Sequence, residues 1–149
     1  MSTTTLKMRI REDLNASRKN RDKGRTLVLT TFISEIRNRE IELGREVGDE
    51  EVESLLTTAI KRRREAADQM RSGGREELAL REEAEAELLR AYLPPQLGEP
   101  EVRALVRDAI SGGAKDLGSV MKAVMPRTKG RFDGKELNRV VREELTIDN

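Results

Sequence analysis

The sequence contains neither cysteine nor histidine. Without cysteine the chain can form no disulfide bond, thiol nucleophile or thiolate metal site. Without histidine it lacks the most common metal ligand and the side chain that most often acts as a general base near neutral pH. The chemistry that remains is that of carboxylates, amines, hydroxyl groups and one tyrosine. We therefore predict no catalytic residue, no metal site and no cofactor.

Aromatic residues are also scarce, at 2% of the 149 residues. A core without them must be built from Leu, Ile, Val, Ala and Met, which suits thin layers of helix packed on helix. Charged residues make up 38% of the chain, but the apolar residues recur at regular helical spacing, which argues against disorder. No segment alternates apolar and polar residues as a strand does. The predicted fold class is all-α.

Long apolar runs and an excess of one charge are missing as well. The 29 Lys and Arg residues face 28 Asp and Glu residues, so only a local patch can select a charged partner. No run is long enough to cross a bilayer, and the start of the chain has no signal-peptide core. Acidic Glu12 and Asp13 argue against a transit peptide. We expect a cytoplasmic protein without a membrane partner.

Residues 1–93 are predicted to form an N-terminal four-helix domain. Apolar spacing and glycine stop signals place its helices at about 6–20, 25–43, 49–72 and 75–93. Asp49 is the expected N-cap of the third helix. The bases at 61–64 in that helix wrap around more than one face, so we expect solvation and pairing with glutamates. The glutamate-rich fourth helix is expected to set an acidic face opposite them.

The segment from Arg18 to Arg25 is rich in bases and ends in Asp22-Lys23-Gly24, which indicates a turn or an N-cap. One interpretation of these bases is a second contact to phosphates. The other, which we prefer, is a solvated helix end, because most surface charge runs serve only that purpose.

Residues 94–149 are predicted to form a C-terminal module of three short helices. The boundary is Leu93-Pro94-Pro95, because proline biases the preceding residue away from helix and two prolines make a stiff joint. In the second of these helices, Asp116 is the expected N-cap and the helix should end before Pro126. Asp133 is the expected cap of the third.

Between Asp116 and Asp133 there is no acidic residue, whereas acids and bases are interleaved elsewhere. Exposed amines and guanidinium groups on a glycine-containing turn can reach phosphates, so this stretch is the candidate nucleic-acid interface. Phe132 has two interpretations, a stacking platform for a base or, preferably, a core anchor between the last two helices. The candidate binding residues are Lys122, Arg127, Lys129, Gly130, Arg131 and Lys135.

Three motifs coincide in this chain. They are Tyr92-Leu93-Pro94-Pro95-Gln96-Leu97, then Gly118-Ser119-Val120-Met121-Lys122, and then the run from Lys129 to Asn138, KGRFDGKELN. In this order and spacing the chain resembles the GatB/YqeY family, specifically its stand-alone YqeY-like members. The resemblance covers nearly the whole chain and is strongest after Tyr92.

The resemblance implies that residues 1–93 are a YqeY-like helical domain and that residues 94–149 resemble the tail of GatB. GatB is a subunit of the glutamine-dependent amidotransferase that converts Glu-tRNA(Gln) or Asp-tRNA(Asn) to the amide form, and its tail engages the tRNA body. The family also carries a label of carbon–nitrogen ligase activity with glutamine as nitrogen donor. This chain has no phosphate-binding G-x-x-x-x-G-K-[ST] loop. We therefore expect no independent catalysis.

Three hypotheses follow. The first is a non-catalytic tRNA-binding or accessory module that contacts RNA phosphates through the basic turn. The second is a protein-interaction module that docks on an amidotransferase or an aminoacyl-tRNA synthetase. The third and weakest is a carbon–nitrogen ligase. The sequence leaves the RNA species, the partner and the oligomeric state open.

Overall fold

A computed structural model describes residues 4–147, and all regular secondary structure within them is α-helical, as predicted. The chain divides into two compact units that meet between Leu93 and Pro94. We call them unit 1 and unit 2 and describe each by itself.

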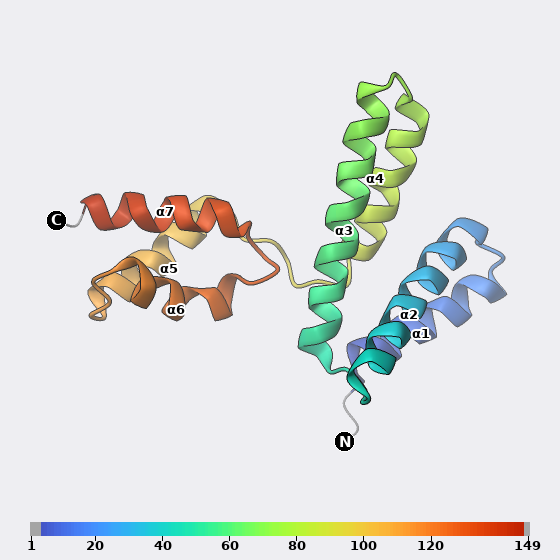
Figure 1. Cartoon of the computed structure of the whole chain (residues 1–149), viewed down its shortest axis with the longest axis horizontal. Coiled ribbons are helices and arrows are strands. Elements are labelled where there is room, and N and C mark those ends of the chain that lie inside the picture. The colour runs from blue at the N-terminus through green and yellow to red at the C-terminus, as the bar shows by residue number, and fades with distance from the viewer. Residues whose placement is uncertain (1–3, 148–149) are drawn as a thin grey trace. The chain divides into compact units, whose positions relative to one another are not determined.

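Unit 1 consists of two antiparallel helical hairpins, drawn from blue to yellow-green in Figure 1. Its helices are α1 (Leu6–Lys19), α2 (Lys23–Leu43), α3 (Asp49–Ser72) and α4 (Glu76–Arg90). Each contributes large side chains to one core, among them Ile10, Phe32, Leu56 and Leu89, which are at most 1% exposed. Burying each such side chain contributes about 1.5–3 kcal/mol, and this core holds the two hairpins together.

The hairpin of α3 and α4 extends beyond α1 and α2 in Figure 1. Small side chains are buried in its outer part. Ala67 and Ala79 are fully buried there, although neither belongs to the main core. Charges complete the contact, since Arg64 lies 3.4 Å from Glu87 and Arg71 pairs with Glu83. The acidic face of α4 therefore lies opposite the basic face of α3, as predicted.

The caps of unit 1 confirm one prediction and correct another. Asp22 is the N-cap of α2 and accepts a bond from the Arg25 amide at 3.0 Å. Asp49 is not the N-cap of α3, because Gly48 holds that position and Asp49 is the first helical residue. The Asp49 carboxylate instead accepts the Leu6 amide at 2.9 Å, at the N-terminus of α1. It satisfies an unpaired donor of a helix 43 residues earlier in the sequence.

Unit 2 consists of α5 (Glu99–Ser111), α6 (Leu117–Thr128) and α7 (Gly134–Ile147), drawn from yellow-orange to red in Figure 1. Its core is built largely from β-branched aliphatic side chains. The buried members are Val102, Val106, Ile110, Val120, Val124, Leu137, Val140 and Val141. Phe132 packs against this core with its side chain partly exposed, which agrees with the anchor interpretation.

The prediction that the second helix of this unit ends before Pro126 is wrong, because α6 continues through it to Thr128. A proline inside a helix removes one backbone donor and disfavours the preceding turn. Here tertiary packing compensates, since Thr128 is only 1% exposed. Its hydroxyl also donates to the Val124 carbonyl at 3.1 Å, which anchors the last turn.

Candidate nucleic-acid interface

Helix α6 separates an apolar face from a basic one. Val120, Val124 and Thr128 recur every fourth residue and are buried in the core. Lys122 lies in the middle of the helix, and Lys129 is the C-cap residue that follows it; both side chains are exposed. The helix contains no acidic residue. Its outer face therefore carries positive charge without a compensating carboxylate.

A tight turn follows α6 and fixes the direction of the chain. The Thr128 carbonyl accepts from the amides of Arg131 at 2.9 Å and Phe132 at 3.0 Å. Lys129 has φ −58° and ψ 125°, and Gly130 has φ 75°. These are the angles of a type II β-turn, whose third residue needs a positive φ that glycine adopts without strain. Gly130 thus shapes the turn that displays Lys129.

Arg131 ties this turn to the segment that precedes α5. Its Nε donates to the Pro95 carbonyl at 3.0 Å, and its backbone carbonyl accepts the Leu97 amide at 2.8 Å. A further guanidinium nitrogen lies 3.4 Å from the Arg127 carbonyl. Arg131 is only partly exposed, and these contacts give it a structural role within unit 2.

The other cations of the candidate site are free of acidic partners. Lys122, Arg127, Lys129 and Lys135 are all exposed. In the described part of the chain none of them forms an ion pair, although sixteen ion-pair contacts occur between other side chains. We call these four residues the free cations. They can approach a polyanion without first breaking an internal pair.

Two aspartates stand at the ends of this acid-free stretch and serve as helix caps, as predicted. Asp116 accepts the Ser119 amide at 2.8 Å, and this hydrogen bond lowers the pKa of its carboxyl group. Asp133 accepts the Glu136 amide at 3.3 Å at the start of α7. The Asp133 carboxylate already occupies that helix terminus, so a phosphate would have to bind through the side-chain cations.

The sequence reasoning missed an ion-pair network on the other side of unit 2. Glu144 of α7 is only 3% exposed and accepts bonds at 3.0 Å from both Arg103 and Arg107 of α5. The hydrogen bond from Arg107 is the main reason that the pKa of Glu144 is lowered. A further ion pair joins Arg103 to Glu143 at 2.6 Å. The available signal was the spacing of Arg103 and Arg107, four residues apart on one helix face.

This network continues around α7 through a third arginine. Arg139 contacts Glu99 at 2.5 Å, Glu136 at 2.7 Å and Glu143 at 2.9 Å. Arg103, Arg107 and Arg139 are therefore all neutralised by carboxylates. The exposed bases of unit 2 that lie outside these ion pairs include Lys122 and Arg127 of α6 and Lys129 at its C-cap, with Lys115 ahead of the helix and Lys135 in α7.

Comparison with known proteins gives the family. The model of the Yqey-like protein family matches residues 7–145, nearly the whole chain. The chain belongs to the Yqey-like protein family. It is also similar to "Altered inheritance of mitochondria protein 41, mitochondrial" of Pyrenophora tritici-repentis, at 28% identity over 91% of this chain and 78% of that protein. The predicted family is thereby confirmed, and that relative carries a mitochondrial name.

Two further findings concern the chemistry open to this Yqey-like chain. Within residues 4–147 no three acidic side chains gather in the way that a metal site requires. None of the helices described there combines the length and the apolar character needed to cross a membrane. What the arrangement does offer is a set of exposed cations, and these attract anions.

Proposed function

We propose that this Yqey-like protein binds structured RNA, most suitably tRNA, as a non-catalytic cytoplasmic accessory module. The observation that supports this function is the set of free cations, Lys122, Arg127, Lys129 and Lys135. In a chain of almost zero net charge, four exposed cations within residues 122–135, without acidic partners among the described residues, favour contact with a polyanion. In this proposal residues 1–93 form the YqeY-like domain and residues 94–149 the RNA-binding three-helix module.

The residues of the basic turn have different roles in this proposal. The free cations contact phosphates. Gly130 gives the turn its shape, and Arg131 holds it against Pro95. If each free cation neutralises one phosphate, the log–log slope of affinity against salt is about −3 to −4. Such binding follows the shape of the RNA backbone and not its base sequence.

The test compares two variants of the full chain that lose the same charge. The first, Lys122→Gln, Arg127→Gln, Lys129→Gln, removes three free cations. The matched control, Lys61→Gln, Arg62→Gln, Arg81→Gln, removes three exposed bases of unit 1 that lie outside every ion pair of the described residues. We expect the first variant to weaken tRNA binding at low salt and to lower the salt slope by about 2–3, while the control binds as the unmodified chain does.

Filter binding or fluorescence anisotropy with unfractionated tRNA measures both the affinity and its dependence on salt. Absence of tRNA affinity in the unmodified chain at low salt contradicts the proposal. So does an equal loss in the two variants, since that result reports total charge and not a site.

A second candidate function is docking on a protein, such as an amidotransferase or an aminoacyl-tRNA synthetase. The observation that favours it is Met125, which is 48% exposed on the same helix as Lys122 and so adds an apolar contact to a basic face. Co-purification separates the two functions, because a protein complex survives treatment with RNase and an RNA-mediated one does not. Under either function the protein is a contact module, and the ligase activity of the family label is not part of the proposal.

A further inference from the structure

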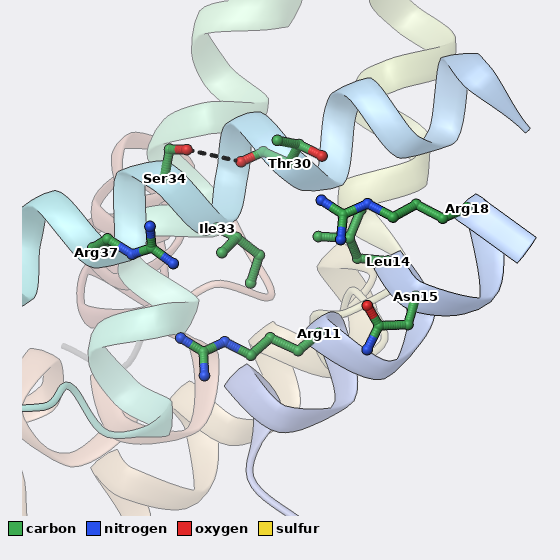
Figure 2. Close-up of a pocket in the computed structure, with 8 residues that line it drawn as sticks. All are labelled: Arg11, Leu14, Asn15, Arg18, Thr30, Ile33, Ser34 and Arg37. Carbon is green, nitrogen blue, oxygen red and sulfur yellow. Dashed lines mark hydrogen bonds between the residues drawn. The ribbon is translucent and has the colours of Figure 1, made fainter.

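Unit 1 contains a pocket of about 280 Å³ between α1 and α2, shown in Figure 2. Leu14 and Ile33 supply its apolar wall and are both less than 10% exposed. Polar and basic side chains line the rest. The complete lining is Arg11, Leu14, Asn15, Arg18, Thr30, Ile33, Ser34 and Arg37.

Three arginines surround this pocket, and no acidic residue lines it. Figure 2 shows Arg11 on α1 and Arg37 on α2 at one end, with Arg18 toward the other. All three side chains are exposed, and none forms an ion pair within residues 4–147. Like charges held around one pocket repel one another, and a bound anion would relieve that repulsion.

The carboxylate of Glu40, which Arg11 influences electrostatically, already has other partners. Glu40 accepts from Lys7 at 2.7 Å and from the Val47 amide at 3.1 Å. Its pKa is lowered first by the hydrogen bond from Lys7, while Arg11 adds only a minor coulombic effect. Arg11 therefore interacts with Glu40 at long range but does not form an ion pair with it.

The remaining polar groups can complete the coordination of an anion. Arg11 and Arg18 are seven residues apart, so they lie about 10 Å apart along one face of α1. Their long side chains can reach two linked anionic groups placed between them. Asn15 lies between these arginines and can donate through its side-chain amide, whereas the Ser34 hydroxyl already donates to the Thr30 carbonyl at 3.1 Å.

We propose that this pocket binds a small molecule carrying two linked phosphate groups, the chemistry shared by inorganic pyrophosphate and nucleoside diphosphates. Arg11 and Arg37 bind one phosphate and Arg18 binds the other. Guanidinium groups suit this ligand because their planar donors match phosphate oxygens in pairs. The apolar wall formed by Leu14 and Ile33 lowers the local dielectric beside the anion and so strengthens the attraction. The site belongs to unit 1 and does not depend on the basic turn of unit 2.

Isothermal titration calorimetry of the full chain at about 0.1 M salt tests the site, with pyrophosphate, ADP and sulfate as separate probes. We expect saturable one-to-one binding of pyrophosphate and ADP that is at least about tenfold tighter than that of sulfate. Arg11→Gln, Arg37→Gln should weaken pyrophosphate binding at least about tenfold. Arg18→Gln alone should weaken it by a smaller factor, and the control Lys61→Gln, Arg62→Gln should bind within about twofold of the unmodified chain.

Nuclear magnetic resonance places the ligand independently of affinity. Amide shifts on adding pyrophosphate should concentrate in residues 11–18 and 30–37, with the Asn15 side-chain amide among them. The proposal is overturned if pyrophosphate does not saturate, if the control loses affinity equally, or if the shifts lie elsewhere. It is also overturned if Arg11→Gln, Arg37→Gln weakens only tRNA binding. The RNA function is tested by the separate variants of α6, so either proposal can fail without the other.

Discussion

The two sides of unit 2 use positive charge in opposite ways. On α5 and α7, the guanidinium groups of Arg103, Arg107 and Arg139 all contact carboxylates, and Glu144 lies buried beneath two of them. On α6 and at its C-cap, the side chains of Lys122 and Lys129 are exposed and have no acidic partner among the described residues. All of these side chains are cationic, and they differ in whether a carboxylate lies within reach of them.

This contrast separates charges that stabilise the fold from charges that are available to a ligand. A paired, partly buried arginine must lose its carboxylate before it can bind a phosphate. An exposed lysine without a partner can bind a phosphate directly, and the nucleic acid then releases the counterions of that phosphate. We therefore expect changes in the α5–α7 network to act on stability and changes in the free cations to act on binding. Substitutions on the two sides should therefore differ in their effect on stability, which is largest for Glu144 and smallest for the free cations.

Glu144→Ala should have the largest effect. It removes the acceptor of Arg103 and Arg107 and leaves a gap where a 3%-exposed side chain was. We expect a loss of about 2 kcal/mol in the free energy of unfolding of unit 2, less than for a fully buried pair because Arg107 remains largely exposed. Urea denaturation followed by circular dichroism measures this loss of stability. The exposed Glu136→Gln is the control, and an equal loss there would contradict the central role of Glu144.

The same network should make unit 2 sensitive to acid. The pKa of Glu144 in the folded chain is below its ordinary value of 4.5, because Arg107 and then Arg103 donate to it. The pKa values of Glu99 and Glu143 are lowered in the same sense by Arg139 and Arg103. This contribution is present above the unfolded-state pKa and is lost as the pH falls through the folded-state value. Stability of unit 2 should therefore decline below about pH 4.5, and Glu144→Gln should flatten the decline. An identical pH profile in that variant would refute this assignment.

Gly130→Ala should have a moderate effect. Its φ of 75° lies in the left-handed region, where a Cβ atom costs about 1 kcal/mol. The matched control is Gly134→Ala, at the start of α7, where the backbone is not in that region and an added Cβ meets no atom within 4 Å. Thermal denaturation of both variants should show a lower melting temperature only for the first. Equal melting temperatures would mean that the turn tolerates another geometry.

The smallest effect on stability belongs to the free cations. Lys122→Gln, Arg127→Gln, Lys129→Gln breaks no ion pair among the described residues, so the free energy of unfolding should change by less than about 0.5 kcal/mol. The same variant is the one expected to lose tRNA affinity. A large loss of stability would show that these residues belong to the fold, and it would remove the division between the two sides of unit 2.

Much of the fold could be predicted from local sequence patterns. Apolar spacing predicted the helices, and Asp116 was correctly predicted as a cap. For Asp22 the sequence left a turn or an N-cap open, and the structure shows the N-cap. The motifs from Tyr92 to Asn138 gave the family, which the comparison confirms. These features depend on residues close together in the sequence, and local rules describe such residues well.

Predictions failed where distant residues decide the outcome. Pro126 lies inside α6 because the core holds Thr128, and Asp49 bonds to Leu6 because the fold brings α1 beside the start of α3. The role of Arg131 is similar, since the sequence shows one more cation in a basic turn while the structure shows a tie to Pro95. The pocket of Arg11, Arg18 and Arg37 combines positions of two helices, and no single stretch contains it.

The sequence by itself determined the all-α class, most helix positions, the family and the acid-free stretch between Asp116 and Asp133. Each of these is a property of composition or of short-range spacing. Only the tertiary structure decided which charged side chains form ion pairs with one another. An ion pair requires two side chains within about 4 Å, and with 38% charged residues the sequence offers many combinations. Packing selects among them, and within residues 4–147 it leaves the free cations of unit 2 and the three pocket arginines of unit 1 outside every ion pair.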